Sequence, residues 1–461
     1  MDIIDIINDL RNGNVTFGGI SALINNILGI LFILCYAYQF FYIIVPWLWK
    51  DKPHKETVPH KIGIFIAARN EESVIQCLID SIHKQTYDLS LVTIFVVADN
   101  CTDQTAEVSR KMGAVVYERF DLEKIGKGYA LEFLYDNIKR DYGEDYFDAF
   151  LVLDADNLLE KNYIEEMNKT FSDGYQVLTS YRNSKNYDDN WISAGYSLWF
   201  LRESKYLNNS RMLLNTTCAV SGTGFMFDAE IMKESGGWNF FLLTEDIEFT
   251  MYNVMKGRKI GYAKDAHLYD EQPTKFSQSW RQRLRWSRGF IQVCGKYTGK
   301  LVSRLWRSFS CYDMFMTILP ALVISILTVV NTVVGLVASI IMGASTEVLL
   351  RSFLVPIVGA YVTCFVIGII TFITEYKNIK CKGPKKFFYC FTFPIFMMTY
   401  IPIAFVALFK KVTWAPIKHD KVKSISEVES DEEITEADEQ STDASESVSV
   451  LSSEEIDTTQ N

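Results

Sequence analysis

Residues 149–156 read Ala-Phe-Leu-Val-Leu-Asp-Ala-Asp, an apolar run that ends in two acids one residue apart. A short apolar run of this kind favours a buried parallel strand. Similar runs lie upstream, at residues 62–68, 91–99 and 114–118. Apolar residues at helical spacing occur between these runs, at 72–85 and 126–140. The alternation predicts repeated β-α-β units in an α/β, Rossmann-like domain that binds ligands beyond the carboxyl ends of its strands.

Apolar segments flank this predicted domain. Residues 27–49 carry no charge and are long enough to span a bilayer as a helix. No basic region precedes this segment, which disfavours a signal peptide. Three Lys residues at 50, 52 and 55 follow it, so the positive-inside rule places the domain in the cytosol. Further apolar segments lie at about 314–342, 349–373 and 387–409.

The basic residues after the last apolar segment conflict with three crossings beyond the domain. Three crossings would put Lys410, Lys411 and Lys418 outside, against the same rule. Either the segment with Pro394 and Pro402 is re-entrant or interfacial, or one crossing is miscounted. We expect a cytosolic C-terminus in a multi-pass protein of the plasma membrane.

The formal net charge of −10 belongs to the C-terminal tail. Residues 424–461 contain 13 acids and neither Lys nor Arg, so the rest of the chain is slightly basic. A slightly basic folded part suits an anionic substrate and an anionic membrane surface. The tail lacks aromatic residues and is predicted to be disordered, with accessory subunits as candidate partners. Nine cysteines without paired spacing indicate reduced thiols, and no nucleic-acid partner is expected.

Asp154 and Asp156 follow the strand predicted at 149–156. Two carboxylates at a strand end both face a crevice if the chain turns there, and their hard oxygens suit Mg²⁺ or Mn²⁺. A divalent ion at this point would neutralise a diphosphate and stabilise it as a leaving group. The alternative is a solvated acidic turn, because the pattern is common.

Other residues that are candidates for binding the molecule that carries the diphosphate, here called the donor, also follow predicted strands or turns. Asp99 ends the second strand and is placed to accept hydrogen bonds from a uracil or a ribose, although an Asx turn or a helix cap would also use it. Lys127 stands between two glycines before a predicted helix, where it either meets a phosphate or is simply exposed. The first strand ends in the same way, with Ala67, Arg69, Asn70 and Glu71.

Thr244, Glu245 and Asp246 open a predicted helix. A Thr followed by two acids is a good helix N-cap, which is the structural interpretation. The functional interpretation makes Asp246 a general base that takes a proton from an acceptor hydroxyl. Small residues upstream would allow a backbone to approach an acceptor sugar, at Ser221, Gly222, Thr223 and Gly224.

Residues 276–300 predict a basic amphipathic helix at a membrane surface. Gln282, Arg285 and Trp286 fall at positions i, i+3 and i+4, on one face of that helix. An Arg makes forked contacts with a diphosphate, and a Trp offers an apolar surface on which a pyranose ring stacks. The three residues together suit a nucleotide-sugar site.

These motifs, in the order Asp99, Asp154-x-Asp156, Thr244-Glu245-Asp246 and Gln282-x-x-Arg285-Trp286, resemble those of the membrane-bound family 2 glycosyltransferases. That group includes cellulose, hyaluronan and poly-N-acetylglucosamine synthases. The segment from Trp414 to His419 is similar to a C-terminal element of the poly-N-acetylglucosamine branch.

The resemblance implies a GT-A fold, a UDP-sugar donor, a divalent cation and inverting single displacement. It also implies that Asp99 contacts the uridine, Asp156 the metal, and Asp246 acts as base beside Glu245. Gln282, Arg285 and Trp286 would close over the diphosphate and the acceptor, and Asp154 would serve both donor and metal.

The expected organisation has an N-terminal segment (1–26), a transmembrane helix (27–49), the GT-A domain (56–272), an interfacial helix region (273–308), three apolar membrane segments (314–409), and a basic segment with the acidic tail (410–461). The expected function is a processive β-polysaccharide synthase that extends a glycan of N-acetylglucosamine or a related hexose. Addition of one sugar to a membrane lipid acceptor is the alternative. A non-catalytic membrane scaffold is a third hypothesis, which complete motif retention opposes.

Overall fold

A computed structural model describes residues 17–318, 320–343, 345–381, 383–416, 419 and 421–427. The segment before residue 17, Ile417, Lys418 and the acidic tail from residue 428 lie outside the described residues, so predictions for them stay untested. The strands are β1 (Ile62–Ala68), β2 (Val92–Asp99), β3 (Val115–Arg119), β4 (Ala149–Asp154), β5 (Leu158–Leu159), β6 (Val177–Ser184), β7 (Phe225–Asp228) and β8 (Ile260–Asp270).

The described helices include one π-helical segment, η2. They are α2 (Phe17–Leu48), α3 (Ile75–His83), α4 (Thr105–Lys111), α5 (Lys127–Tyr142), α6 (Tyr163–Ser172), α7 (Trp191–Arg202), η2 (Glu203–Asn208), α8 (Asn209–Leu213), α9 (Glu230–Ser235), α10 (Glu245–Met255), α11 (Phe276–Val302), α12 (Phe309–Ile318), α13 (Pro320–Ile341), α14 (Thr346–Thr374), α15 (Lys385–Met398) and α16 (Tyr400–Phe409).

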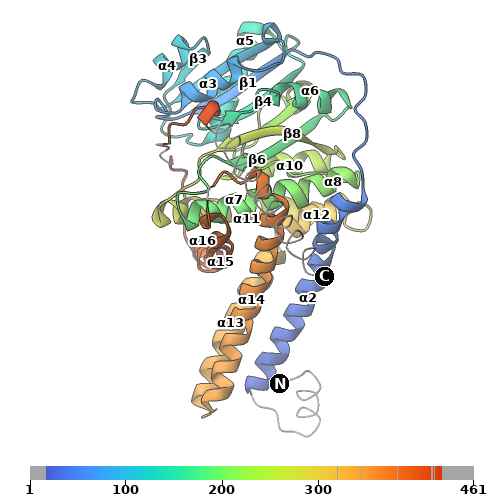
Figure 1. Cartoon of the computed structure of the whole chain (residues 1–461), viewed down its shortest axis with the longest axis vertical. Helices are drawn as coiled ribbons and strands as arrows, with labels where there is room; N and C mark the ends of the chain where they lie inside the picture. The colour runs from blue at the N-terminus through green and yellow to red at the C-terminus, as the bar shows by residue number, and fades with distance from the viewer. Residues whose placement is uncertain are drawn as a thin grey trace, which may run out of the picture.

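Within the described residues, eight strands form one mixed sheet in the order β3-β2-β1-β4-β7-β6-β8-β5 (Figure 1). The first four strands pair in parallel, as the sequence predicts. β7 runs antiparallel to both β4 and β6, whereas β6 and β8 are parallel. The sheet is therefore Rossmann-like on one side and mixed on the other.

Each face of the sheet buries its own apolar cluster. Along β1, Ile64 and Ile66 pack with α3 and α6, whereas Phe65 belongs to the cluster that includes α5, α7 and α10. Successive side chains of a strand point to opposite faces, so one strand of alternating contacts serves both clusters. This sandwich holds the strand ends rigidly, which matters for the site described below.

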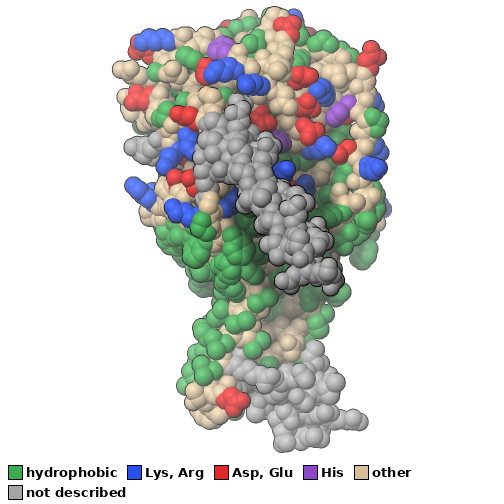
Figure 2. Space-filling view, viewed as in Figure 1, with side chains coloured by type: hydrophobic (Ala, Val, Ile, Leu, Met, Phe, Trp, Pro, Cys, Tyr) green, Lys and Arg blue, Asp and Glu red, His purple; other side chains and the backbone are tan. Residues whose placement is uncertain are grey.

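Below the sheet, three long apolar helices (α2, α13 and α14) extend away from the domain, and hydrophobic side chains cover this lower part (Figures 1 and 2). Within the part of the chain that the structure describes, four segments are long and apolar enough to span a membrane: Gly19–Leu48, Val323–Ile341, Phe353–Thr374 and Lys385–Phe409. The first helix begins at Phe17, before the predicted start at residue 27. Asn25 and Thr332 hydrogen bond between α2 and α13 (2.9 Å), which ties these helices together.

The last apolar segment divides into two helices, α15 and α16, which lie beside α7 and α11 at the base of the domain (Figure 1). Arg283 of α11 is fully buried there and donates hydrogen bonds to Thr399 Oγ1 (2.6 Å) and to the backbone oxygen of Phe396 (3.2 Å). Its guanidinium also lies over the ring of Phe396, at 4.4 Å. These contacts join α11 to the junction between α15 and α16.

The chain after α16 returns to the sheet domain. His419 Nδ1 lies 3.0 Å from Glu71 Oε1, and Lys421 pairs with Asp189 at 3.0 Å. Ile425 is buried against Leu158. The described C-terminal residues and the sheet domain therefore lie on the same side of the α13–α14 hairpin.

Candidate active site

One cavity of about 920 Å³ begins at the carboxyl ends of β1, β2 and β4 and continues between α2, α13 and α14. These three strands are parallel neighbours, so their carboxyl ends meet at one edge of the sheet. The predicted site residues that line the cavity are Ala67, Arg69, Glu71, Asp99, Lys127, Asp154, Asp156, Ser221, Gly222, Glu245, Asp246, Gln282, Arg285 and Trp286.

Three of the predicted site residues, Asn70, Thr223 and Gly224, do not line this cavity. Asn70 adopts a left-handed φ of 58°, and its Oδ1 accepts a hydrogen bond from the backbone of Thr102 (2.8 Å). Thr223 Oγ1 accepts one from the backbone of Asp154 (2.9 Å). Gly224, with a φ of 65°, packs so tightly that a side chain would have no room. All three hold the surrounding loops in shape.

Asp99 is held by a partner that the sequence did not reveal. Arg119 Nη1 donates a hydrogen bond to Asp99 Oδ1 at 2.6 Å, and both side chains are buried. The two residues are register partners on β2 and β3. A bond between a carboxylate and a guanidinium holds both side chains in place, so Asp99 presents a fixed acceptor at the cavity wall.

Lys127 bridges the predicted donor and acceptor segments. Its Nζ pairs with Asp154 Oδ1 and donates a hydrogen bond to the backbone oxygen of Gly222 (2.8 Å). Burial lowers the pKa of Lys127, but Asp154 and Glu245 outweigh it and the net pKa is raised. Lys127 is therefore a buried cation, suited to an anionic ligand.

Asp156 lies deeper than Asp154 and has a histidine close by. Its Oδ2 accepts a hydrogen bond from the backbone of Glu271 (2.8 Å). Burial raises the pKa of Asp156, but His419 and Lys185 outweigh it and the net pKa is lowered. Burial lowers the pKa of His419, yet Asp156 and Glu71 raise it to about 10. The C-terminal segment thus adds a charged group to the site.

Asp154 and Asp156 fit the requirements of Mg²⁺ or Mn²⁺. Within the described residues, no group of three or more His, Cys, Asp or Glu is placed to hold a metal ion. Mg²⁺ is usually held by one or two carboxylates together with substrate phosphates and waters. Two carboxylates at the wall of an open cavity match that pattern, with the remaining ligands supplied by a bound diphosphate.

The acids at the start of α10, Glu245 and Asp246, have raised pKa values. Asp246 Oδ2 accepts a hydrogen bond from the backbone of Gly222 (2.6 Å). Burial and the neighbouring Asp246 raise the pKa of Glu245 to about 7, and burial also raises the pKa of Asp246. Thr244 makes no capping hydrogen bond through its side chain, so helix capping does not explain this triplet. A raised carboxyl pKa in a cavity is typical of acid–base catalysis.

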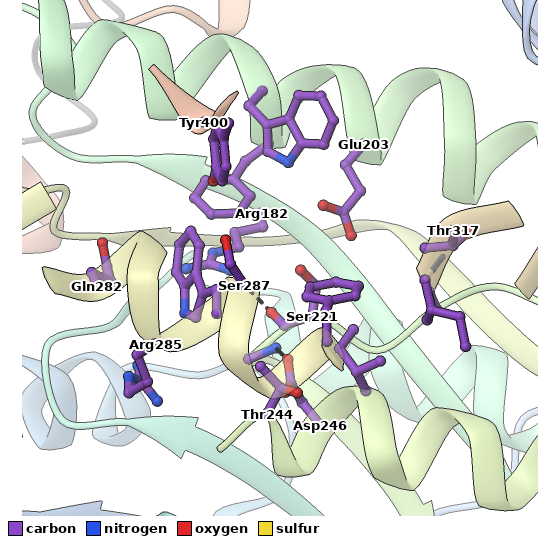
Figure 3. A pocket seen from close by; sticks show the side chains of 18 of the residues that line it. Arg182, Glu203, Ser221, Thr244, Asp246, Gln282, Arg285, Ser287, Thr317 and Tyr400 are labelled. Atoms are coloured by element: carbon purple, nitrogen blue, oxygen red, sulfur yellow. Dashed lines mark hydrogen bonds between the residues drawn. The ribbon is translucent and has the colours of Figure 1, made fainter. Parts of the chain in front are cut away.

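The predicted face of α11 forms one wall of the cavity (Figure 3). Arg285 Nη1 donates a hydrogen bond to the backbone oxygen of Leu243 (3.3 Å), which joins this wall to the segment before α10. Trp286 packs edge-on against Tyr196, with centroids 5.8 Å apart. Arg283, on another face, is the residue that anchors α11 to α15 and α16.

Three buried polar atoms in the cavity wall lack a partner among the described residues: Arg69 Nη1, Thr244 Oγ1 and Gln282 Oε1. Buried polar groups in proteins are nearly always hydrogen-bonded. Their presence at the edge of one cavity indicates positions that a bound ligand would satisfy.

Sequence reasoning missed further charged groups in this cavity, among them Arg182 and Glu203 (Figure 3). Arg182 Nε donates to Asp270 Oδ2 (2.8 Å), and its Nη1 donates to the backbone oxygen of Ser221 (3.0 Å). Burial raises the pKa of Glu203, whose carboxylate hydrogen bonds the side chain of Ser221. No local motif marks either residue; both reach the site through β6 and the end of α7.

The membrane end of the cavity has a different wall. It is formed by one face of α2, with Phe32, Tyr36, Phe40 and Ile43, and by residues of α13 and α14 that are mostly apolar. These side chains recur every three or four positions, so each helix presents a single face to the cavity. The cavity therefore joins a charged compartment at the strand ends to an apolar one between the long helices.

Comparison with known proteins supports the assignment of the fold and the family. A probable glycosyltransferase, YdaM of Bacillus subtilis, is 25% identical over 280 residues, which cover 55% of this chain and 61% of the relative. A β-monoglucosyldiacylglycerol synthase of Synechocystis is 23% identical, covering 51% and 49%. A poly-β-1,6-N-acetyl-D-glucosamine synthase of Staphylococcus aureus is 23% identical, covering 50% and 55%. The chain thus matches about half the length of these relatives.

Among solved structures, a mannosyltransferase from Pyrobaculum calidifontis, in complex with GDP-Man and Mn²⁺, aligns with a TM-score of 0.51. It is 14% identical, and the alignment covers 84% of this chain and 99% of that one. This likeness shows that the sheet domain has the GT-A fold. The profile of the glycosyltransferase-like family 2 matches residues 59–289, half of the sequence and all of the predicted motifs. This chain belongs to the family 2 glycosyltransferases.

Proposed function

We propose that this enzyme transfers one sugar from a UDP-sugar to a hydroxyl group of a membrane lipid. The observation that carries the proposal is the continuity of the cavity. Its charged end lies beside Asp154 and Asp246, and its apolar end lies between α2 and α14. A lipid would place its acyl chains between the helices while its head group reaches the base.

Asp246 is the proposed base. It removes the proton from the acceptor hydroxyl as that oxygen attacks the anomeric carbon, and the bond from that carbon to the diphosphate breaks on the opposite side. The anomeric configuration is inverted, and the UDP leaves with the bonding electron pair. Burial raises the pKa of Asp246, which makes it a stronger base than an ordinary carboxylate.

The donor is proposed to bind at the strand ends. Asp99 would accept a hydrogen bond from the nucleoside, and Lys127 and Arg285 would contact the diphosphate. Mg²⁺ or Mn²⁺, held by Asp154 and Asp156, would neutralise charge on the departing diphosphate. Gln282 has an unsatisfied buried oxygen that suits a hydroxyl donor on the sugar or the acceptor.

The processive synthase expected from the family resemblance is the competing function. A growing glycan would pass through the helices in a channel whose walls carry hydrogen-bonding groups for the sugar hydroxyls. The apolar faces of α2 and α14 favour acyl chains instead. Trp286 suits either function, because its ring lines the cavity and would stack on an acceptor of either kind.

The catalytic domain is proposed to face the cytosol of a plasma membrane. Lys50, Lys52 and Lys55 directly follow the first apolar helix, as cytosolic flanks do. With α2, α13 and α14 as the spanning helices, the residues after α16 lie on the same side of the membrane as the catalytic domain. The basic residues at 410 and 411 then obey the same rule.

The test uses the purified full chain in lipid nanodiscs with radiolabelled UDP-glucose, UDP-N-acetylglucosamine or UDP-glucuronic acid. Single transfer gives a product that extracts into organic solvent and whose mass equals one lipid plus one sugar. An aqueous product of many sugars, with no glycolipid, would establish the synthase instead. Asp246→Asn serves as the inactive control, and omission of divalent cations tests the roles of Asp154 and Asp156.

A further inference from the structure

Arg202, the last residue of α7, is a cation in the cavity without a counter-ion. Its Nη2 donates a hydrogen bond to Gln39 Oε1 on α2 (2.9 Å), and its guanidinium lies 5.1 Å from the ring of Trp199. It forms no ion pair within the part of the chain that the structure describes. Burial, only partly offset by Glu203, lowers the pKa of Arg202 to about 10, so it stays charged at neutral pH. A charge in an apolar environment needs a partner.

The local backbone also marks this position. Directly after Arg202, the six residues Glu203–Asn208 form a π-helical segment that connects α7 to α8. π-Helical turns are rare and occur frequently at functional sites. Here Arg202 and the adjacent Glu203 both line the cavity, although neighbours on a regular helix point about 100° apart.

Two of the other arginines that line the cavity, Arg182 and Arg211, differ from Arg202 because each is paired with an acid. Arg182 pairs with Asp270, and Arg211 makes two hydrogen bonds to Asp313, both of 2.8 Å. Their positive charges are already neutralised. Arg202 alone among these three is left to meet an anion that enters the cavity.

The polar groups follow an order along the cavity. Glu203 hydrogen bonds the side chain of Ser221. The backbone N–H of Gly222, which follows Ser221, donates a hydrogen bond to Asp246. Glu203 therefore lies toward the catalytic base. Arg202 contacts α2, one of the apolar helices, and so lies toward the membrane. Hydrogen-bond acceptors for hydroxyl groups therefore come first, a cation second and apolar helix faces third.

We propose that the acceptor is a phospholipid with a hydroxyl-bearing head group, whose phosphate pairs with Arg202 while its free hydroxyl reaches Asp246. This inference rests on the proposed lipid acceptor and specifies its class. The head group would extend past Glu203 toward the donor sugar, and the acyl chains would lie along α2 and α14. A neutral diacylglycerol would leave the guanidinium unpaired.

The test compares two acceptors with the same acyl chains, phosphatidylglycerol and diacylglycerol, in detergent micelles with the full-length enzyme. Both carry a free hydroxyl, and only the first carries a phosphate. The wild-type KM for phosphatidylglycerol should be about 10- to 100-fold lower, the range expected for one charge-assisted contact. Arg202→Gln should remove this preference by raising the KM for phosphatidylglycerol more than the KM for diacylglycerol, and Arg202→Lys should retain part of it.

Arg281→Gln is the matched control, because Arg281 is exposed on α11 and does not line the cavity. It should leave the preference unchanged. Equal use of both lipids by the wild type, or an equal loss with both lipids in Arg202→Gln, overturns the inference while leaving single transfer to a lipid in place. A polymer product with no glycolipid overturns the proposed function itself. If Arg202→Gln fails to fold, the wild-type preference still decides.

Discussion

The two ends of the cavity differ in the chemistry of the side chains that form their walls. At the strand end, charged side chains are paired before any ligand arrives, as in Lys127 with Asp154 and Arg119 with Asp99. At the membrane end, the walls are mostly apolar side chains, together with Arg202, a cation that forms no ion pair within the described residues. Paired charges are preorganised, which suits a soluble, highly charged donor. Apolar walls suit a molecule that partitions into the bilayer, so one cavity can hold two chemically unlike substrates.

The largest effect is expected at the junction of the two ends. Asp246→Asn keeps the shape and the hydrogen bond from the backbone of Gly222 but removes the base. We expect transfer to fall about 100- to 10,000-fold, the usual range for loss of general base catalysis. The measurement is kcat for sugar transfer. Asp136→Asn, at an exposed position on α5, should be unchanged. Activity of Asp246→Asn near that of the wild type would exclude this residue as the base.

A second prediction contrasts the paired and unpaired arginines by stability. Arg211→Met leaves Asp313 buried without its cation, and such a break costs about 3–5 kcal/mol. The thermal midpoint of the detergent-solubilised enzyme should fall sharply. The double variant Arg211→Met with Asp313→Leu should recover most of the loss.

The matched variant Arg202→Met removes a charge that has no counter-ion. Its thermal midpoint should stay near that of the wild type or rise slightly, because desolvation of an unpaired cation is unfavourable. A loss as large as that of Arg211→Met would mean that Arg202 has a structural role, and the contrast between the two arginines would not hold.

A third prediction separates the two ends by function. Ala360 lines the membrane end on α14, so Ala360→Phe should fill part of that compartment and reduce lipid glycosylation about tenfold, as loss of one buried acyl contact would. UDP release in the absence of acceptor should persist, because the donor end is untouched. Val358→Phe, on an exposed part of the same helix, is the control. Equal loss of UDP release and transfer in Ala360→Phe would mean that the two compartments are not separable.

The smallest effect concerns pH. Asp246 must be deprotonated to act, and its pKa is raised, so kcat/KM should fall as the pH drops through that raised pKa. Glu245, with a pKa of about 7, adds negative charge beside Asp246. Because the two carboxyls interact, Glu245→Gln removes one of the two titrating groups and should move the acid limb of the profile to lower pH. An unmoved acid limb would show that the two carboxyls are not coupled.

Much of the donor end could be predicted from sequence because its signals are local. The strand at 149–156 and the helix after Gly126 follow from apolar periodicity, and the motif residues follow the strands at fixed offsets. Arg119 was missed, since its partnership with Asp99 depends on the register of two strands 20 residues apart in the chain. The short antiparallel β7 was missed too, because four residues carry little periodic signal.

Hydropathy and motif order were enough to identify a membrane-associated α/β transferase, because both are properties of short segments. The return of His419 to the strand ends and the joining of a charged compartment to an apolar one depended on packing between distant segments. An apolar helix can face lipid, a protein core or a substrate, and its composition is the same in each case. Only the tertiary structure shows what α15, α16 and the inner faces of α2 and α14 contact.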